Sequence, residues 1–519
     1  MLSEANDLDI FTVPGRKHST WARTFFCRPE RYLQPSTIAQ LQTAIKSAHR
    51  LKKTITFVGA GHSPSDLTMS DSWIINLDNF DAVLSFSPHE AGLFTDVRVE
   101  AGIRLYQLNQ VLASRGLALQ NLGSISEQSV AGVISTGTHG SSAYHGLISQ
   151  QIVNITLLLA SGELVTVSPT VRPDLFRAAM LSLGKLGVIT HITFRTIPAF
   201  TIHSSQEIID FDTLLSDWSK IWTSREYVRV WWFPYSRKCI LWRAERSQLP
   251  LSKPRESFYG TFLGRKLYEF MLWVATVVYP RAMPAVERFV FRKQYGWEPT
   301  YGLGGSEAVQ NSVEALNMDC LFKQFVNEWA MNLTHGVNVL RLVDAVVSRA
   351  AETGQYYVHA PIEVRCSNCS YPESNVSPFE IRESSGIGAI PGNTLRPLLE
   401  SAPPTPYSND IAIDNLTLYL NATMYRPFGI PPPIGDWYRE FEDIMVAYGG
   451  RPHWAKNFIG KSLNINEKPK VDGEMVGLKS VFGEWFGDDG ALFRKIRGDV
   501  DPEGIFLGGH DWAERNGII

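Results

Sequence analysis

A glycine-rich loop that carries a histidine is the first stretch of this sequence that could bind a ligand. The strand-like run TITFV, residues 54–58, leads into GAGHSPS, residues 59–65. Gly-x-Gly after a strand is half of a dinucleotide-binding fingerprint, but Pro64 stands where the helix and the third glycine should follow. Glycines still let backbone N–H groups approach an anion, and the serines add hydroxyl donors. The loop therefore predicts a phosphate site outside the Rossmann pattern.

A second polar loop lies further along the chain. Residues 121–142 read NLGSISEQSVAGVISTGTHGSS, with several glycines, many hydroxyl groups and few charges. Burying such a stretch costs free energy unless its polar groups meet partners. A serine-rich surface loop is one interpretation. Two such loops in one segment favour the other, a single extended cofactor lying across both.

Opposite charges at alternate positions mark a third candidate. The segment PIEVRCS, residues 361–367, has strand character. Side chains two positions apart on a strand point to the same face, so Glu363 and Arg365 face the same way. From the residues alone, a surface ion pair is the simpler interpretation.

Helix and strand patterns over residues 35–200 must position the two loops. One amphipathic helix is expected after an N-cap at Ser36 or Thr37, and two more at residues 105–116 and 173–184. Strands are expected at TITFV, WIINL, VRVEAG and GVITHITFRTI, with a hairpin around Ser161-Gly162.

The pattern changes beyond residue 200, which is the expected domain boundary. Tryptophan-rich strands such as YVRVWWFPY and CILWRAE follow, and then a further strand, LTLYLNATMYRP. Residues 370–410 are rich in Pro, Ser and Asn and predict a long loop.

Composition limits the protein class. The 519 residues are enough for two or three domains, and a net charge of −3 gives no indication of a nucleic-acid partner. The five cysteines form no disulfide framework, and the pair Cys366 and Cys369 lacks the further ligands of a zinc site. A reduced compartment is the simpler interpretation, and MLSEANDLDIF lacks the pattern of a secretory signal.

The most apolar stretch is LYEFMLWVATVVYP, residues 267–280. It is shorter than the roughly 20 residues that span a bilayer, and Glu269 interrupts it. A buried helix and a helix lying on a membrane surface are both open interpretations. The flanking residues that favour the membrane surface are Arg265, Lys266, Trp273, Tyr279 and Arg281.

Four motifs in a fixed order give the sequence a resemblance to a known family. FVGAGHSPSD, the 121–142 loop, EVRCSN at 363–368 and HWAKNF at 453–458 together resemble the aldonolactone oxidases, above all the fungal arabinonolactone oxidases. These are flavoproteins of the vanillyl-alcohol-oxidase type. The resemblance continues through DPEGIFL at 501–507.

The resemblance implies an α+β fold. After an N-terminal extension, 1–22, a PCMH-type FAD-binding domain of two subdomains is expected at 23–200. An α+β substrate (cap) domain with an antiparallel sheet is expected at 201–519, and its C-terminal segment, 440–519, would fold back on the FAD domain.

The resemblance also assigns residues to FAD. The pyrophosphate loop would be Val58, Gly59, Ala60, Gly61, His62, Ser63 and Pro64. The flavin and pyrophosphate would be lined by Gly123, Ser124, Ser129, Gly132, Thr136, Gly137, Thr138, His139, His453 and Lys456, and Ile189 would meet the adenine side. The family's oxidases join FAD covalently, through the flavin 8α-methyl carbon, to the histidine that is His62 here. Without that bond His62 would be a loop histidine bonded to the backbone.

Catalysis in the family implies roles for Glu363, Arg365 and Lys456. The substrate would be a five-membered sugar lactone whose C2 hydride passes to flavin N5, giving an ascorbate-type product. Arg365 and Lys456 would stabilise the developing alkoxide, and Glu363 would fix the hydroxyls and pass on the proton. Gly123 would leave oxygen a path to the flavin, so molecular oxygen is expected to be reduced to hydrogen peroxide. No metal is expected.

Two alternatives remain beside this hypothesis. One is a broader L-gulono- or L-galactono-lactone or alditol oxidase on the same fold. The other is a membrane-associated binding protein that keeps the flavin fold without turnover. Family precedent and residues 267–280 predict a location on the cytosolic side of the outer mitochondrial membrane, with a cytoplasmic location as the alternative.

Overall fold

The first of three main sheets is small and parallel. The computed structural model describes residues 7–89, 92–368, 382–384, 388–390, 392–402, 411–460 and 476–519. Strands β3 (Arg31–Leu33), β5 (Trp73–Asn76) and β4 (Ile55–Val58) pair in that order. Helix α2 (Ile38–Leu51) lies against them, and Thr37 Oγ1 accepts a hydrogen bond from the Gln40 N–H at 3.2 Å. The expected N-cap is therefore confirmed. A two-stranded ribbon, β1 (His18–Ser19) and β2 (Phe26–Cys27), precedes this sheet.

The second sheet is antiparallel. Its order is β10 (Leu164–Val167), β9 (Ile152–Leu158), β11 (Val188–Pro198), β7 (Thr95–Glu100) and β6 (Val83–Pro88), with β8 (Leu117–Ala118) also paired to β11. The hairpin expected at Ser161-Gly162 joins β9 to β10. Helices α3 (Leu105–Ser114), α4 (Val130–Ser135) and α5 (Pro173–Ala179) accompany this sheet.

Helix α5 is shorter than predicted. It ends at Ala179, whereas the sequence indicated a helix up to Gly184. Leu183 takes a left-handed conformation, φ 53°, and its N–H donates to Ser135 O at 2.9 Å. A bond to the last residue of helix α4 therefore replaces the last turn of α5.

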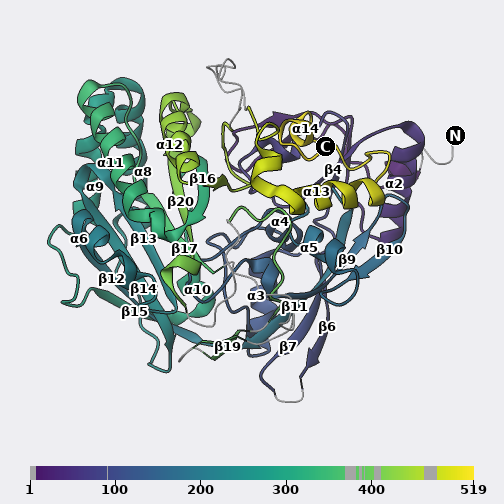
Figure 1. Ribbon diagram of the computed structural model, residues 1–519, viewed down its shortest axis with the longest axis horizontal. Helices are drawn as coiled ribbons and strands as arrows, with labels where there is room; N and C mark the ends of the chain where they lie inside the picture. The colour runs from purple at the N-terminus through teal and green to yellow at the C-terminus, as the bar shows by residue number, and fades with distance from the viewer. Residues whose placement is uncertain are drawn as a thin grey trace.

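The third sheet has eight antiparallel strands. Its first strand in the sequence, β12, follows directly after β11, the last strand of the second sheet. Its order is β15 (Ser306–Asn311), β12 (Thr201–Asp210), β14 (Lys238–Ser247), β13 (Tyr227–Phe233), β17 (Ile362–Ser367), β20 (Thr417–Tyr425), β16 (Gln324–Asn332) and β21 (Arg451–Pro452). The accompanying helices are α6 (Phe211–Ser216), α7 (Trp218–Ile221), α8 (Phe262–Trp273), α9 (Met283–Gln294), α10 (Ser312–Leu316), α11 (Gly336–Thr353) and α12 (Gly435–Ala447). Figure 1 shows α8, α9, α11 and α12 gathered at the outer end of this half. The expected α+β fold with an antiparallel cap sheet is confirmed.

The C-terminal segment returns to the first sheet. Helices α13 (Phe482–Val500) and α14 (Trp512–Arg515) lie over the N-terminal part of the chain (Figure 1). The Ile55 N–H donates to Ile505 O at 2.7 Å, and Arg515 pairs with Asp66 at 2.7 Å. The chain end therefore supports the strand that leads into the glycine-rich loop.

The structure also bears on three further predictions: the apolar stretch at 267–280, the long loop at 370–410 and the pair Cys366 and Cys369. A π-helical turn, Val274–Val278, extends α8, and among the described residues no helix is long and apolar enough to cross a membrane. Most of the 370–410 loop, and Cys369 with it, lies outside the described residues, apart from 392–402 and the short strands β18 (Arg382–Ser384) and β19 (Gly388–Ile390). Cys366 is buried in β17.

Candidate active site

Two cavities meet at the glycine-rich loop. One, of about 790 Å³, is lined by residues 56–63, by Ser129, Gly132 and Thr136, and by 183–185. The other, of about 1130 Å³, lies between the 121–142 loop and the eight-stranded sheet. His62, Ser63 and Gln128 line both. The loop thus stands at the junction of a glycine-lined channel and a wider chamber.

The glycine-rich loop packs tightly on the start of α4. A Cβ atom on Gly59 would lie 2.0 Å from Ser129 Oγ, which itself caps α4 by accepting from the Gly132 N–H at 3.4 Å. Gly61 has φ +68°, a conformation that side chains rarely adopt. The loop geometry therefore requires both glycines. Because they carry no side chains, the loop backbone itself lines the channel.

His62 is held as a neutral base at the junction. Its ring stacks on Trp21 at 5.6 Å between centroids, and its Nδ1 is buried without a hydrogen-bond partner in the part of the chain described. Burial lowers the pKa of His62, and the Glu127 carboxylate only partly opposes this. A neutral imidazole with a free nitrogen can act as a nucleophile.

The eight-stranded sheet sets four cavity residues in one row. Across β13, β17, β20 and β16, the antiparallel register pairs Trp231 with Glu363, Glu363 with Asn421, and Asn421 with Glu328. Residues directly opposite each other share a face of the sheet, and all four line the larger cavity. The row two positions along places Arg365 beside Tyr419. The register alone thus assembles the floor of the chamber.

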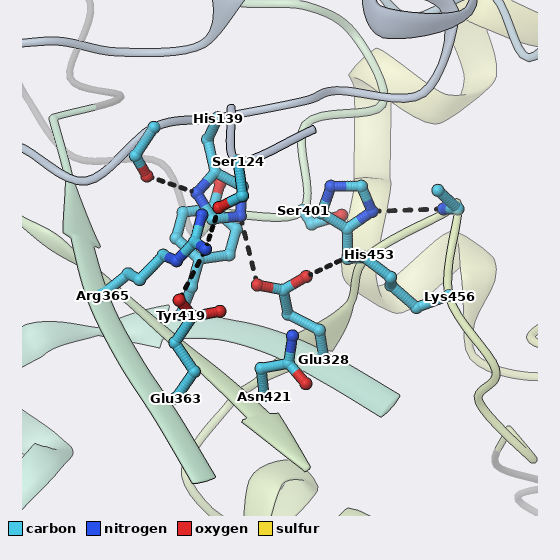
Figure 2. A network of polar contacts seen from close by, with 12 residues as sticks. Ser124, His139, Glu328, Glu363, Arg365, Ser401, Tyr419, Asn421, His453 and Lys456 are labelled. Atoms are coloured by element: carbon cyan, nitrogen blue, oxygen red, sulfur yellow. Dashed lines mark hydrogen bonds and ion pairs between the residues drawn. The ribbon is translucent and has the colours of Figure 1, made fainter. Parts of the chain in front are cut away.

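Glu363 and Arg365 form a buried pair. Arg365 Nη2 lies 2.6 Å from Glu363 Oε1, and the same nitrogen donates to Ser124 Oγ in the 121–142 loop (Figure 2). Burial lowers the pKa of Arg365, but the Glu363 and Glu328 carboxylates outweigh this and the pKa is raised. The surface ion pair that was the simpler interpretation is wrong, since Arg365 is only 7% exposed.

Lys456 reaches the same cavity from the C-terminal segment. Its Nζ lies 3.1 Å from Glu328 Oε2, and the other oxygen of this carboxylate lies 3.3 Å from His139 Nε2. His453 stands beside them and accepts a hydrogen bond at Nδ1 from the Ala455 N–H at 3.2 Å. Burial lowers the pKa of His453 to about 3, so this ring is neutral.

The structure brings most of the sequence-predicted residues to the two cavities. The channel is lined by Val58, Gly59, Ala60, Gly61, His62, Ser63, Ser129, Gly132 and Thr136. The chamber is lined by His62, Ser63, Pro64, Gly123, Ser124, Thr138, His139, Glu363, Arg365, His453 and Lys456. Gly137 and Ile189 line neither: Gly137 sits at a left-handed turn against Leu181, and Ile189 is a core residue of β11.

Several cavity residues carry no motif that the sequence could reveal. Glu328 lies in the apolar strand run QFVNEWAMN, where a carboxylate inside a buried strand was the available signal. Others among the lining residues are Trp21, Lys185, Trp231 and Asn421.

The cavities fit a dinucleotide-flavin cofactor. The channel offers a glycine cradle with backbone donors for a pyrophosphate, and its wall includes the buried Thr56 hydroxyl, which has no partner within the described ranges. The chamber adjoins this channel and is lined by both polar and apolar side chains, which suits a planar ring and a small polar substrate. Fold and site together define an FAD-dependent oxidoreductase.

Comparison with known proteins gives the family. Residues 29–168 match the FAD binding domain family, and residues 192–516 match the family described as D-arabinono-1,4-lactone oxidase. The chain is 57% identical to the D-arabinono-1,4-lactone oxidase of Yarrowia lipolytica, with 97% of each chain covered. It is 45% identical to that of Saccharomyces cerevisiae, with 98% of each covered. The chain belongs to the D-arabinono-1,4-lactone oxidase family.

Solved structures extend the likeness in fold. A solvent-stable cholesterol oxidase superposes with a TM-score of 0.72 over 96% of both chains, at 16% identity. The cholesterol oxidase from Brevibacterium sterolicum gives the same TM-score at 15% identity, with 96% of this chain and 95% of that chain covered. At these identities the likeness concerns the fold alone.

Replacing Gly59 by alanine should weaken FAD binding. The added methyl would collide with Ser129 and displace the start of α4. Overpacking of this kind costs about 1–3 kcal/mol, which corresponds to a loss of affinity of about 5- to 150-fold if the whole cost falls on the bound form. The flavin-to-protein absorbance ratio of the purified variant measures the loss.

Gly498→Ala in α13 is the matched control, because a Cβ atom there would meet nothing within 4 Å. A Gly59→Ala protein that keeps full flavin content would contradict the assignment of this loop to the cofactor.

Proposed function

We propose that this protein oxidises D-arabinono-1,4-lactone at its C2 hydroxyl and passes the electrons through FAD to molecular oxygen, forming hydrogen peroxide. The observation that carries the proposal is the buried Glu363–Arg365 pair on the chamber floor, in contact with the 121–142 loop and facing Lys456 across the same cavity. The named activity of the relatives supports the choice of lactone.

The residues present divide the chemistry between them. Bound FAD supplies the hydride acceptor. Arg365 remains a guanidinium, because its raised pKa keeps it charged, and donates to the C2 oxygen as that oxygen gains negative charge. Glu363 accepts the hydroxyl proton as the C2 hydride departs. The ketolactone that results then enolises to the enediol of an ascorbate-type product.

Lys456 and the residues of the sheet row, Asn421 and Trp231 among them, line the space that the sugar would occupy. Asn421 stands between the two carboxylates, Glu363 and Glu328, and offers an amide to the ring hydroxyls. Trp231 lines the far end of the row and gives the lactone ring an apolar wall. A broader specificity for L-gulono- or L-galactono-lactones is the competing proposal, and relative kcat/KM values for the three lactones separate the two.

Replacing Glu363 by glutamine should abolish turnover and leave FAD in place. Loss of a proton acceptor typically reduces kcat by about 10²–10⁴-fold. The assay follows lactone consumed, oxygen consumed and peroxide formed, which should agree one to one in the wild type. Glu440→Gln, which removes a carboxylate from an exposed pair with Arg349, is the control with unchanged turnover.

Two outcomes would contradict the proposal. Full activity in Glu363→Gln would remove the proton-acceptor role. Electrons that pass from lactone to cytochrome c without peroxide would make the enzyme a dehydrogenase. Gly123 bears on this second point, since a Cβ atom there would lie 2.8 Å from the Thr138 methyl group, so a larger residue would narrow this side of the chamber.

We also propose that FAD is attached through His62. The ring is neutral, has a buried nitrogen that meets no partner among the described residues, and lies where the channel opens into the chamber. Bond formation joins an imidazole nitrogen to the 8α carbon. The imidazole loses one proton and the methyl group another, and the two electrons released pass through the flavin to oxygen.

Acid precipitation tests the attachment. The wild-type pellet should be yellow, and the His62→Ala pellet should be white with the flavin in the supernatant. Flavin released from the wild type by acid would overturn the covalent bond and leave the oxidase proposal intact.

A membrane-facing surface is proposed for helix α8 and its π-helical turn. Phe262 and Leu263 are 80% and 77% exposed, and Phe270, Val277 and Val278 are exposed on the same segment. Tyr268 and Leu272 are buried against the cap, so the segment presents one face to the core and one to solvent. With Arg265, Lys266 and Arg281 beside it, the outer face suits an anionic lipid surface. A location on the outer mitochondrial membrane is the corresponding proposal.

Vesicle flotation tests this surface. The wild type should float with anionic liposomes, and the double variant Leu263→Glu, Phe270→Glu should remain at the bottom with activity unchanged. Leu303→Glu, at an equally exposed leucine outside this segment, is the control. A wild type that does not float, or a control as impaired as the double variant, would contradict the proposal.

A further inference from the structure

Glu328 is a buried carboxylate with both oxygens engaged. It lies on β16, is 3% exposed and faces the chamber from the end of the row that begins at Trp231. One oxygen faces Lys456 Nζ and the other faces His139 Nε2, as Figure 2 shows. The carboxylate therefore joins the C-terminal segment to the 121–142 loop.

The charge of Glu328 persists in spite of its burial. Burial raises its pKa, but the Lys456 charge and the hydrogen bond with His139 outweigh this and hold the pKa well below its usual range. A buried carboxylate of this kind requires cations beside it, since an unpaired buried charge is strongly destabilising.

The contacts of His139 define its protonation. Nδ1 lies 2.8 Å from Gly140 O and Nε2 lies 3.3 Å from Glu328 Oε1, so both ring nitrogens face acceptors. A neutral imidazole carries a single N–H, whereas both contacts are hydrogen bonds only when the ring is an imidazolium. The ring also stacks on Tyr419 at 3.6 Å between centroids, an arrangement that favours a cation.

The groups around His139 include two carboxyl groups, Glu328 and Glu400, and one cation, Lys456, that opposes its charge. Glu328 comes from β16, Tyr419 from β20, His453 and Lys456 from the C-terminal turn, and Glu400 from the 392–402 segment. His453 is neutral and adds no charge. Burial raises the pKa of Glu400, and the charges of Arg396 and His139 oppose this rise.

We infer that Glu328 is a positioning residue for the proposed lactone oxidation: it holds His139 as an imidazolium and Lys456 as an ammonium at the wall of the chamber. Around the chamber Glu363 offsets Arg365, Glu328 offsets Lys456 and Asp319 is paired with Arg265, so the imidazolium leaves one net positive charge. That charge favours the negative charge that develops on the substrate oxygen. The inference rests on the proposed function and adds the residue that keeps its cations charged.

The pH dependence of turnover distinguishes positioning from packing. The alkaline limb of kcat reports the loss of a proton from the site's cations. Removing the neighbouring negative charge destabilises those cations, so the limb of Glu328→Gln should shift to lower pH by about one unit or more. Glu328→Asp keeps the charge and should retain the wild-type limb at a lower rate, while Glu440→Gln should match the wild type in both.

A uniform loss of activity in Glu328→Gln with the limb unmoved would overturn the inference and make the residue structural. A measurement on the wild-type holoenzyme reads the protonation of His139 directly and does not depend on how the Glu328 variants fold. In ¹⁵N-histidine-labelled protein, the His139 signal, assigned by its loss in His139→Gln, should show both ring nitrogens protonated at neutral pH. A neutral tautomer would overturn the inference. If the wild type oxidises no lactone, the proposed function fails separately, because the imidazolium signal does not depend on turnover.

Discussion

The chamber depends on the register of one antiparallel sheet. Glu363, Asn421 and Glu328 are direct cross-strand partners on β17, β20 and β16, so their side chains share a face without any help from loops. A slip of one residue would turn this face away and bring Val364 and Leu420, both fully buried, into the chamber. The apolar packing behind the sheet therefore fixes the position of the polar row in front of it.

Burying this row would be costly if its charges were not matched. Glu363 and Glu328 each lie within ion-pair distance of a cation. Arg365, the partner of Glu363, also contacts Ser124 in the 121–142 loop. Lys456, the partner of Glu328, comes from the C-terminal turn. Pairing seldom adds net stability in a protein interior, because desolvation offsets the attraction. The benefit lies in fixed charges that need no rearrangement when charge develops on a substrate.

The sequence predicted the elements that position the site better than it predicted the site itself. Thr37 as an N-cap and the hairpin at Ser161-Gly162 follow local rules, and the structure has both. The end of α5 depends on a bond between Leu183 and Ser135, far apart in sequence, which local pattern does not contain. Glu328 escaped for a similar reason: its role comes from partners on β20, the 121–142 loop and the C-terminal turn. The other site residues were located by motifs that follow the order of a known family. Lys456 is one of them, and without the HWAKNF motif it could not be distinguished from a solvated lysine.

Asn457, the last polar residue of the HWAKNF motif, explains how this turn is held in place. The Asn457 N–H donates to Val326 O at 2.6 Å, and its side-chain oxygen accepts from the Val326 N–H at 3.0 Å, so the turn adds a rung to β16. The side-chain amide then donates to Pro64 O at 2.8 Å. One residue thus ties the sheet that carries Glu328 to the loop that carries His62. Because Lys456 directly precedes Asn457, the same bonds hold its backbone beside the chamber, where its ammonium pairs with Glu328. Asn457 thus acts together with the His453 N–H, which donates to Glu328 O at 2.8 Å, and the Ser65 N–H, which donates to Ala455 O at 3.4 Å, in holding the turn between the sheet and the loop.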